Sequence, residues 1–417
     1  MRIVHVLSND APGGLNQAAI RLHEGLLERG VHSLVCLRRL AAPRRAVVVH
    51  GPRSLGLQRA WESIRAKIDA VPVRLRSGRA YLSPSWVPTT MHRTVARLRP
   101  DIVHVHQPHT ANLTPASLRR FGGPVVATLH DMWFFTGGCT YAGECRRFVD
   151  HCGNCPKAAW GHAHDSSRLG WSAKRRHYPL DRMTFVAPSR WMLKVARSSS
   201  LLGSARFEVI PYGIDLAAFR RKPRAASRAR FGLSADARVI GLIADRVADP
   251  RKGFDLGLEA AARAAASLPP GQLQVLVAGA GMVGRGPVSS PPWLHYAGTV
   301  GGADVVDFYS ALDLLLLPSR EDNLPNVGIE SSATGTPVVG FDVGGIADIV
   351  CDRATGLVSP FDTSALAKLV VRLLQDVDAL RDLGSRTQQH AEKAFALPVC
   401  VDRHIALYTS LMTPRNA

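Results

Sequence analysis

A strand–loop–helix pattern at the start of the chain constrains the fold more than any other feature. Residues 2–7 form a strand-like run rich in β-branched residues, and residues 8–15 contain the turn sequence Asp-Ala-Pro-Gly-Gly. The next stretch, AAIRLHEGLLERG, repeats apolar residues at spacings of three and four up to Gly30, as in an amphipathic helix. Another strand-like run follows at residues 32–37. This βαβ order predicts a parallel sheet with helices on its faces.

The same pattern recurs along both halves of the chain. Strand-like runs at residues 101–106, 124–130 and 183–189 are followed, in the second half, by ARVIGLIA, LQVLVAGAG, DLLLLPS and TPVVGFD. We therefore expect an α/β chain with two doubly wound, Rossmann-like domains that face each other across a cleft. The predicted parts are 1–210, 211–395 and a C-terminal helix, 396–417, that packs back on the first domain. Because ligands bind at the carboxyl ends of such strands, the cleft is the predicted site.

The positive charge of the chain is confined to its first half. The 417 residues carry a formal net charge of +19, with 31 Lys+Arg against 12 Asp+Glu in residues 1–210 and 21 against 21 in residues 211–417. A basic surface favours a polyanionic partner, such as a membrane with acidic lipids, a phosphorylated substrate or nucleic acid. A solvated Arg-rich surface is the alternative, but it does not explain a neutral second half.

The hydropathy pattern predicts no membrane span. No apolar stretch approaches the roughly 18 to 20 residues that a span needs, and the N-terminus lacks the layout of a signal peptide. We expect a cytoplasmic chain, at most attached to a membrane face, with its seven cysteines reduced. Residues 48–90 have a weak pattern and high charge, which predicts short helices and loops, and residues 219–230 are predicted to form a connector.

Two glycine-rich turns are candidates for phosphate binding. Gly13 and Gly14 lie between the first strand and the first helix, where backbone N–H groups and the helix dipole favour an anion. A tight turn that needs a positive φ is the alternative. GAGMVG at residues 279–284 matches the G-x-G-x-x-G pattern of nicotinamide dinucleotide sites. The following GRGPVSSPPW indicates a loop rather than the required helix, which argues against a dinucleotide.

Cations and carboxylates in the second half suit a nucleotide sugar. Arg246 ends a predicted strand and Lys252 follows six residues later, so that both can converge on one anion. Asp322 and Glu330 are eight residues apart, and a helix is predicted to begin near Asn326. Amides at that helix N-terminus suit phosphate, while the carboxylates suit sugar and ribose hydroxyls. Stabilisation of the helix dipole is the alternative role for Glu330.

Several longer segments carry a family resemblance. The second half contains ADR…RKG, PSREDNLPNVGIESSATGTPVVGFDVGGIADIV and TGLVSPFDTSALA. The first half contains GGLNQAAIRLHEGLLERGVHS, DIVHVH, TLHDMWFFTGGC, CGNCP, APSRWM and VIPYGID. Together they resemble family 4 of the glycosyltransferases, which are retaining nucleotide-sugar transferases of GT-B fold. The first-half segments resemble the subgroup that builds bacterial exopolysaccharide and capsule, including colanic-acid-type transferases. The match runs from about residue 1 to 370 and covers residues 45–95 poorly.

The resemblance implies roles for residues of the second half. Arg246 and Lys252 match the basic pair that holds the donor diphosphate and stabilises its charge as it leaves, so that no metal or other cofactor is required. Glu330 matches the carboxylate of the E-x7-E motif that binds ribose. Asp322 stands where this motif usually has its first Glu, facing the donor sugar, and is one methylene shorter.

Further donor-binding and catalytic residues follow from the same resemblance. Asn323 and Leu324 replace the usual Gly-Phe, whose backbone amides approach the phosphate, and Asn326 begins the following helix. His130 matches the family's histidine near the transferred sugar, although a buried histidine bonded to a backbone carbonyl is the alternative. Gly13 and Gly14 match the loop that closes over phosphate and acceptor. The implied catalytic residues are His130, Arg246, Lys252 and Asp322.

Four cysteines form the pattern C-x5-C-x6-C-x2-C: Cys139, Cys145, Cys152 and Cys155. One C-x2-C pair is present and zinc would order a loop with little apolar content, but the other pair lacks the spacing of a common zinc ribbon. Structural zinc, a redox-reactive pair and plain reduced cysteines therefore remain three alternatives.

The resemblance implies transfer of a hexose from a nucleoside diphosphate sugar to a hydroxyl of a polyprenyl-diphosphate-linked oligosaccharide, with retention. The expected partners are the nucleotide sugar, this acceptor and an anionic membrane surface at the inner face of the cell membrane, without nucleic acid. Two other classes stay open. The charge of +19 allows a nucleic-acid-binding α/β protein, although no basic recognition helix with interleaved aromatics is visible. GAGMVG alone supports a nicotinamide-dependent oxidoreductase.

Overall fold

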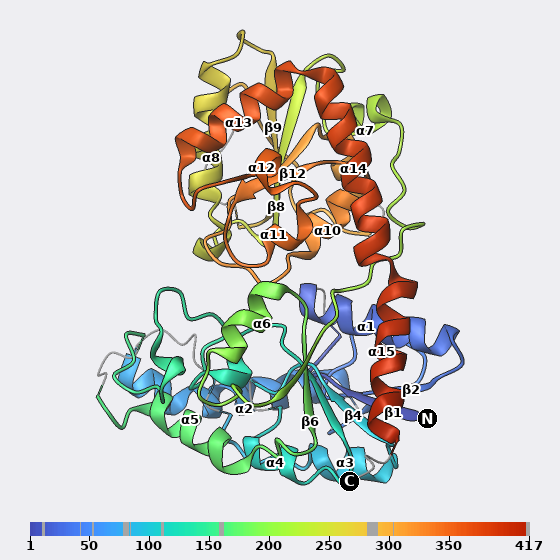
Figure 1. Ribbon diagram of the computed structural model, residues 1–417, viewed down its shortest axis with the longest axis vertical. Coiled ribbons are helices and arrows are strands. Elements are labelled where there is room, and N and C mark those ends of the chain that lie inside the picture. The colour runs from blue at the N-terminus through green and yellow to red at the C-terminus, as the bar shows by residue number, and fades with distance from the viewer. Residues whose placement is uncertain are drawn as a thin grey trace. The chain divides into compact units, whose positions relative to one another are not determined.

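The chain folds into two compact units, Met1–Pro211 together with the end of the chain from Cys400, and Tyr212–Val399. The computed structural model describes residues 1–10, 13–41, 43–51, 54–77, 83, 85–109, 112–157, 162–281, 291–302 and 304–413. Each unit contains one parallel sheet, and helices pack on its faces (Figure 1). The predicted α/β class with two Rossmann-like units is confirmed.

The first unit is built on a seven-stranded parallel sheet with the order β3-β2-β1-β4-β5-β6-β7. Its strands are β1 (Arg2–Val6), β2 (His32–Leu37), β3 (Val47–Val49), β4 (Ile102–Val105), β5 (Val125–Thr128), β6 (Met183–Ala187) and β7 (Arg206–Val209). Its helices are α1 (Gly14–Glu28), α2 (Leu55–Ser77), α3 (Met91–Arg97), α4 (Pro115–Arg119), α5 (Ser166–His177), α6 (Arg190–Arg197) and the 3-10 turns η1 (Trp133–Phe135) and η2 (Arg147–Val149).

The second unit is built on a six-stranded parallel sheet with the order β10-β9-β8-β11-β12-β13. Its strands are β8 (Arg238–Arg246), β9 (Leu273–Ala280), β10 (Leu294–Tyr296), β11 (Leu314–Leu317), β12 (Val338–Phe341) and β13 (Leu357–Val358). Its helices are α7 (Arg224–Arg230), η3 (Pro250–Lys252), α8 (Phe254–Ala266), α9 (Asp304–Ala311), α10 (Asn326–Ala333), α11 (Ile346–Ile349), α12 (Arg353–Gly356), α13 (Thr363–Gln375) and α14 (Val377–Phe395).

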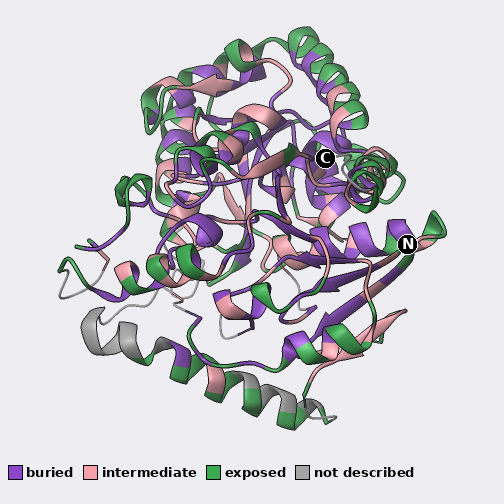
Figure 2. Cartoon of the chain, turned by 60° about the horizontal axis from the view of Figure 1, so that its bottom comes forward, coloured by how far each residue is buried: buried purple, intermediate pink, exposed green. Residues whose placement is uncertain are grey.

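Both faces of the second sheet are buried, which explains why its strands read as continuous apolar runs rather than alternating ones. In β11, Leu315 and Leu317 pack in one hydrophobic cluster, whereas Leu314 and Leu316 pack in another on the opposite face. Buried residues follow the strands and the inward sides of the helices (Figure 2).

The basic segment at residues 48–90 differs from its prediction. A single helix, α2, covers 23 residues of it, where we expected short helices and loops. The helical spacing of its apolar residues outweighs its high charge. The prediction that residues 219–230 form a connector is also wrong, since they lie within the second unit and include α7.

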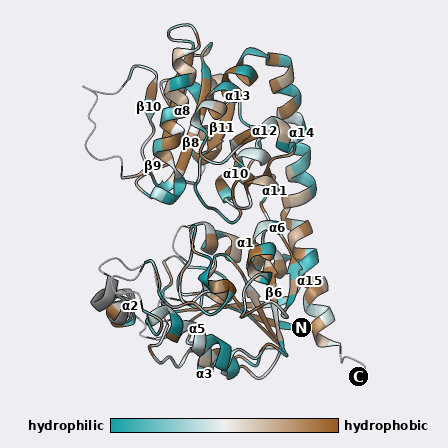
Figure 3. Ribbon diagram, turned by 60° about the vertical axis from the view of Figure 1, so that its left-hand side comes forward, coloured by the Kyte–Doolittle hydropathy of each residue, from teal (hydrophilic) through white to brown (hydrophobic). Residues whose placement is uncertain are grey.

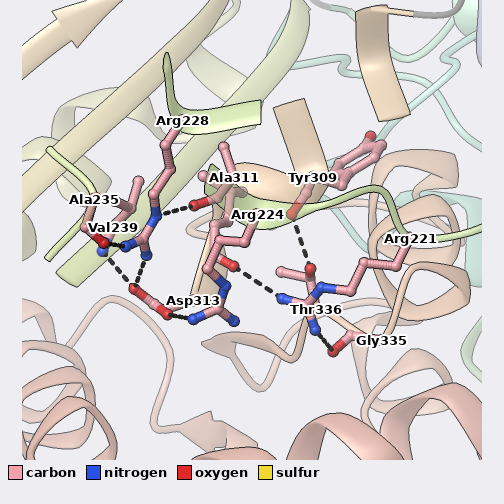
Figure 4. Close-up of polar contacts among 11 residues, drawn as sticks. Arg221, Arg224, Arg228, Ala235, Val239, Tyr309, Ala311, Asp313, Gly335 and Thr336 are labelled. Atoms are coloured by element: carbon pink, nitrogen blue, oxygen red, sulfur yellow. Dashed lines mark hydrogen bonds and ion pairs between the residues drawn. The ribbon is translucent and has the colours of Figure 1, made fainter. Parts of the chain in front are cut away.

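The arginines of α7 explain why this segment is not a free connector. Arg228 and Arg224 form ion pairs with the fully buried Asp313, at 2.8 and 2.7 Å, and Arg228 also donates to the carbonyl of Ala311 (Figure 4). The same Asp313 carboxylate accepts the N–H of Val239 in β8 at 2.7 Å. This ion-pair network fastens α7 to the sheet of the second unit.

Helix α15 (Leu397–Met412) brings the end of the chain to the first unit. The Tyr408 hydroxyl lies 2.6 Å from His104 Nδ1, and Arg29 pairs with Asp402 at 3.2 Å. Within the described ranges, no helix combines the length and hydropathy that a membrane span requires.

Candidate active site

The carboxyl ends of β8 and β11 form the switch point of the second sheet. The two strands are neighbours, but the chain continues from β8 to β9 on one side and from β11 to β12 on the other. Ligands of doubly wound sheets bind outside such a point. Arg246 is the last residue of β8, and Asp322 lies in the loop after β11, so the sequence-predicted residues converge there.

A short helical turn brings Lys252 to this point. The Asp249 side chain caps η3 by accepting the N–H of Arg251 at 3.0 Å. Gly253 follows with φ of 65°, and a Cβ atom there would lie 1.9 Å from the carbonyl oxygen of Pro318, directly after β11. Only glycine allows this close approach, which fixes η3 against the loop that carries Asp322.

Asp322 is buried and holds two cations. Its carboxylate oxygens lie 2.6 Å from Lys252 Nζ and 3.3 Å from an Arg251 guanidinium nitrogen. Burial alone would raise the pKa of Asp322, but the nearby charges of Lys252 and Arg251 outweigh burial and lower it. Asp322 is therefore a carboxylate bound to its neighbours, and its predicted place facing the donor sugar stays a prediction.

The loop after β12 packs against the backbone of the same residue. Gly345 donates its N–H to the Asp322 carbonyl oxygen at 3.0 Å. Gly344 has φ of 58°, and a Cβ atom there would lie 1.9 Å from that oxygen. Three loops, after β8, β11 and β12, are therefore packed together around Asp322.

The remaining residues that were predicted to bind the donor lie in and directly before α10. Asn323 and Leu324 are buried, and the Asn323 N–H donates to a carboxylate oxygen of Asp322 at 3.0 Å. Asn326 is the first residue of α10, as predicted from the sequence. Glu330 lies one turn further along and accepts a hydrogen bond from the buried Tyr309 hydroxyl at 3.1 Å, which orients its carboxylate.

Arg246 differs from Lys252 in its surroundings. Its side chain is exposed, and no described residue pairs with its guanidinium. Lys252, by contrast, is mostly buried and bonded to Asp322. A guanidinium without a protein partner beside a fixed ammonium is suited to bind an anion with two negative groups, such as a diphosphate.

The first unit places His130 at the end of a chain of buried imidazoles. His130 follows β5, and its Nε2 lies 3.0 Å from Nδ1 of His106, whose Nε2 lies 2.9 Å from Nδ1 of His5. Burial lowers the pKa of His130 to about 3, with Asp131 opposing the shift, so that the ring is neutral. The bond of the ring to a second histidine is a contact that the sequence did not predict.

Gly13 and Gly14 begin α1, but nothing in their geometry requires a bound anion. Gly13 precedes the helix with φ of 150°, and a Cβ atom at this position would meet no other atom within 4 Å. Ala11 and Pro12 of this turn, and Met282–Gly284 of GAGMVG, lie outside the described residues.

The four cysteines lie close together without a disulfide. Cys139 hydrogen-bonds with Cys155, and this contact together with burial raises the pKa of Cys139 well above its ordinary value. Cys152 accepts the N–H of Gly137 at 3.2 Å. In the described part of the chain, the cysteines do not form a group of three whose sulfur atoms all lie within 4.8 Å. Structural zinc remains a prediction that needs metal analysis.

A histidine group does meet that distance: His5, His104 and His106. Most of its nitrogen atoms, however, already bond to protein groups, with Thr128 and Tyr408 as the partners of His104 at 2.7 and 2.6 Å, and Nε2 of His5 is the one ring nitrogen of the three without a partner among the described residues. Burial lowers the pKa of all three rings well below the ordinary value, so they are neutral. Five of the six ring nitrogens are engaged in these hydrogen bonds, which argues against a metal site here.

Four residues were not predicted from the sequence: two at the candidate site of the second unit and two of the histidines joined to His130. Arg251 could have been predicted, because it stands next to Lys252 in the sequence. His5 and His106 could have been predicted from the histidines that lie in or directly after two neighbouring strands, β1 and β4. Tyr309 had no signal, because its contact with Glu330 joins α9 to α10 across the fold.

Family models match most of both units. Residues 237–376, which contain the cations and carboxylates described above, match the model for glycosyl transferases group 1. Residues 12–218, which contain His130 and both glycines, match the model for glycosyltransferase family 4. The chain therefore belongs to the glycosyltransferases. Within this class its first half assigns it to family 4, as the sequence resemblance predicted.

Curated relatives match part of the chain. The D-inositol 3-phosphate glycosyltransferase of Nocardia farcinica is 35% identical over 199 residues, or 45% of this chain and 44% of the relative. The protein of the same name from Thermobispora bispora is 34% identical over 221 residues, or 50% and 51% of the two chains. The chain thus spans about half the length of the curated relatives it matches.

Solved structures match nearly the whole chain. Sucrose-phosphate synthase from Thermosynechococcus elongatus has a TM-score of 0.68 at 20% identity and covers 99% of both chains. Anabaena HepE in complex with UDP-glucose has a TM-score of 0.67 at 17% identity, covering 99% of this chain and 100% of its own. At such identities the likeness concerns the fold alone, and it confirms the predicted GT-B class.

Proposed function

We propose that this chain transfers a hexose from a nucleoside diphosphate sugar to a hydroxyl group of a lipid-linked oligosaccharide, with retention at the anomeric carbon. The proposed process is bacterial exopolysaccharide or capsule biosynthesis at the inner face of the cell membrane. One observation carries the donor half of this proposal: Arg246 and Lys252 stand at the switch point of the second sheet, with Lys252 fixed by Asp322. The acceptor half rests on the resemblance and on the basic first half of the chain.

Each proposed donor contact follows from the chemistry of the residue. Arg246 and Lys252 bind the diphosphate, and the N-terminus of α10 at Asn326 presents backbone N–H groups to it. Glu330, oriented by Tyr309, accepts hydrogen bonds from the ribose hydroxyls. Asp322 positions Lys252 and, as the resemblance implies, faces the donor sugar, since a carboxylate that bonds to two cations still has lone pairs that can accept a sugar hydroxyl.

The reaction needs charge stabilisation rather than a covalent intermediate on the protein. The bond from the anomeric carbon to the donor phosphate breaks, and the bond to the acceptor oxygen forms on the same face. The proton of the acceptor hydroxyl passes to the departing phosphate oxygen. Negative charge therefore grows on the diphosphate, where preorganised cations stabilise it without rearrangement. In this proposal His130, Gly13 and Gly14 face the sugar and the acceptor, and no cofactor is required.

A panel of nucleotide sugars, screened for hydrolysis and for thermal stabilisation, tests the proposal. The variants Arg246→Ala and Lys252→Ala are expected to lower turnover on the accepted donor by about 10² to 10³ fold, the usual effect of one lost charge-stabilising donor. Arg381→Ala, at a strongly exposed arginine of α14, is the matched control and is expected to keep full turnover.

Two results would contradict the proposal. One is a chain that binds and hydrolyses no nucleotide sugar of the panel. The other is a pair of folded Arg246 and Lys252 variants that turn over as fast as the control. Electrophoretic mobility shift at physiological salt and stabilisation by nicotinamide dinucleotides, measured in parallel, report on the two other function classes.

A further inference from the structure

An exposed apolar stripe runs along α2. Leu57, Trp61, Ile64, Ile68 and Val71 follow one another at spacings of four, three, four and three residues. This spacing places them on one side of the helix within an arc of about 80°, since each residue advances about 100°. Their exposed fractions are 61, 44, 52, 42 and 43%. A soluble surface helix normally turns such a stripe toward the core, so this face lacks an intramolecular partner among the described residues.

Contacts on another side of α2 fix the outward orientation of the stripe. Asp69 is buried and accepts hydrogen bonds from the Ser83 hydroxyl at 2.9 Å and the Trp86 N–H at 3.1 Å. Arg65 donates to the Pro88 carbonyl at 2.7 Å. The helix is thus attached to its unit by these residues, and α2 lies at the periphery of that unit (Figure 3). Trp86, 49% exposed, adds a second exposed indole next to the helix.

The stripe has positive charge beside it. Helical geometry places Arg65 and Lys67 on its two sides, about 80° from its centre. Residues 53–79 contain seven Lys+Arg against two Asp+Glu, in a first half that carries the entire net charge. Long basic side chains next to an apolar face, with indoles near the boundary, are typical of a helix that lies in a membrane interface.

We propose that α2 is a membrane-docking helix, whose stripe inserts among the acyl chains of an anionic bilayer while its basic side chains contact the headgroups. A second copy of the chain is a poorer occupant, because two such helices would bring like charges together. Docking through α2 holds the chain at the membrane surface, where the lipid-linked acceptor of the proposed function lies. The vesicle experiment below does not depend on that function.

Co-sedimentation with large unilamellar vesicles tests the docking helix. One set contains equal amounts of phosphatidylglycerol and phosphatidylcholine, and the other contains phosphatidylcholine alone. Leu57→Glu is expected to lower partition into the anionic vesicles about tenfold or more, because it replaces inserted apolar surface by a charge. Leu169→Glu in α5 is the matched control, since Leu169 is also 61% exposed in the same unit, and is expected to stay within twofold.

Charge and insertion are separated by a second comparison. Lys67→Glu is expected to weaken binding to the anionic vesicles about fivefold or more and to leave the weak binding to phosphatidylcholine unchanged. Equal binding by the Leu57 and Leu169 variants would overturn the proposal. So would a dimer that Leu57→Glu dissociates in sedimentation velocity while vesicle binding persists.

Donor hydrolysis in buffer distinguishes this proposal from the proposed function. Leu57→Glu is expected to keep full hydrolysis and lose vesicle binding, whereas Lys252→Ala is expected to lose hydrolysis and keep vesicle binding.

The buried imidazoles of the first unit carry a second, independent inference. His5, His106 and His130 are joined by two nitrogen-to-nitrogen hydrogen bonds of 2.9 and 3.0 Å. Each neutral imidazole has one N–H donor and one bare nitrogen, so the two bonds must run in the same direction. No described residue bonds to the other nitrogen of His5, the buried Nε2. A buried N–H without an acceptor is rarer than a buried acceptor without a donor, so this Nε2 is the bare nitrogen.

We infer that His5 and His106 are positioning residues that keep the proton of His130 on Nδ1. His5 donates from Nδ1 to Nε2 of His106, and His106 donates from Nδ1 to Nε2 of His130. His5, which lies in the interior of the unit, sets the direction of both hydrogen bonds. A role of the His130 Nδ1–H in the reaction rests on the proposed function, which places His130 beside the sugar.

Nitrogen-15 NMR of the chain labelled at histidine tests the tautomer directly. The expected spectrum shows a protonated Nδ1 and a bare Nε2 for His130, assigned by their disappearance in His130→Gln. His106→Leu is expected to give a mixture of tautomers and to lower kcat 10- to 100-fold with little change in KM for the donor, and His106→Gln to restore most of both.

His164→Gln, at an exposed histidine, is the control for the effect of losing one imidazole. A His130 ring protonated on Nε2 in the unmodified chain would overturn the inference. So would a His106→Leu variant whose His130 tautomer is unchanged. Loss of activity in His130→Gln alone tests the proposed function and not this inference.

Discussion

Replacement of Asp313 by Asn is expected to destabilise the second unit strongly. The Asp313 side chain is fully buried and lies 2.8 Å from Arg228, 2.7 Å from Arg224 and 2.7 Å from the backbone nitrogen of Val239 (Figure 4). Asn keeps the shape and one acceptor oxygen but removes the charge. Arg228, whose side chain is 5% exposed, then remains buried without a counter-charge.

The magnitude follows from the burial of each partner. Removing one member of a buried ion pair typically costs about 3–5 kcal/mol, because the other charge stays desolvated. Arg224 adds little, since its side chain is 43% exposed and exposed pairs contribute about 0–1 kcal/mol. Arg228 also donates to the carbonyls of Ala311 and Ala235, which limits the loss. We expect the free energy of unfolding to fall by about 3 kcal/mol.

Hydrogen exchange measured by mass spectrometry is the suitable assay, because it reports on β8 separately from the first unit. Asp313→Asn is expected to accelerate exchange throughout β8. Asp304→Asn is the matched control, because Asp304 also pairs with an arginine of α7 at 2.7 Å but with both side chains about half exposed. We expect it to cost at most about 0.5 kcal/mol. Equal protection of β8 in the two variants would refute the argument from burial.

Three further predictions concern the candidate site and the cysteines. Because the pKa of Asp322 is lowered in the folded chain, its ion pair stabilises the chain above the ordinary pKa of 3.8 and this contribution is lost as the pH falls through the lowered folded pKa. In urea titrations the stability difference between the unmodified chain and Asp322→Asn should shrink below about pH 4, and a difference independent of pH would contradict this. Gly344→Ala should destabilise the chain well beyond Gly302→Ala in thermal unfolding, since both glycines have φ of 58° but only the first meets another atom within 4 Å. Metal analysis of the purified chain tests zinc at the four cysteines, and less than about a tenth of an equivalent would exclude the usual four-thiolate site.

The central strands of both sheets were predictable because strand and helix periods differ and these strands are apolar runs bounded by turns. The edge strands β3, β7 and β13 were not predicted. The α2 helix was not predicted, although its apolar residues follow one another at regular spacings of four and three residues. Its high charge hid that spacing, and a helix whose apolar stripe faces outward violates the usual link between amphipathicity and a core. The α7 helix was missed for a related reason: its arginines indicate a solvated connector until Asp313 is known to lie opposite them.

The residues of the candidate site were predictable to the extent that they lie in contiguous motifs. Arg246 ends β8, Lys252 follows in η3 and Asp322 lies in the loop after β11, and parallel strands bring such positions to one edge of the sheet. The contacts of Asp322 could not be predicted. They depend on the close approach of η3 to the loop after β11, which Gly253 allows. Tyr309 reaches Glu330 through a tertiary contact that leaves no local pattern.

The two halves of the chain differ in net charge and in the charges that stand at their switch points. Residues 1–210 carry the whole net charge of +19, yet burial keeps the imidazoles around His130 neutral. The second half has no net charge, but a bonded lysine and an exposed arginine stand at its switch point. Salt screens exposed charges more than buried ones. Added salt should therefore release the chain from anionic vesicles at concentrations that still permit binding of a nucleoside diphosphate. If salt abolished both together, the assignment of the basic first half to the membrane and of the bonded Lys252 to the donor would fail.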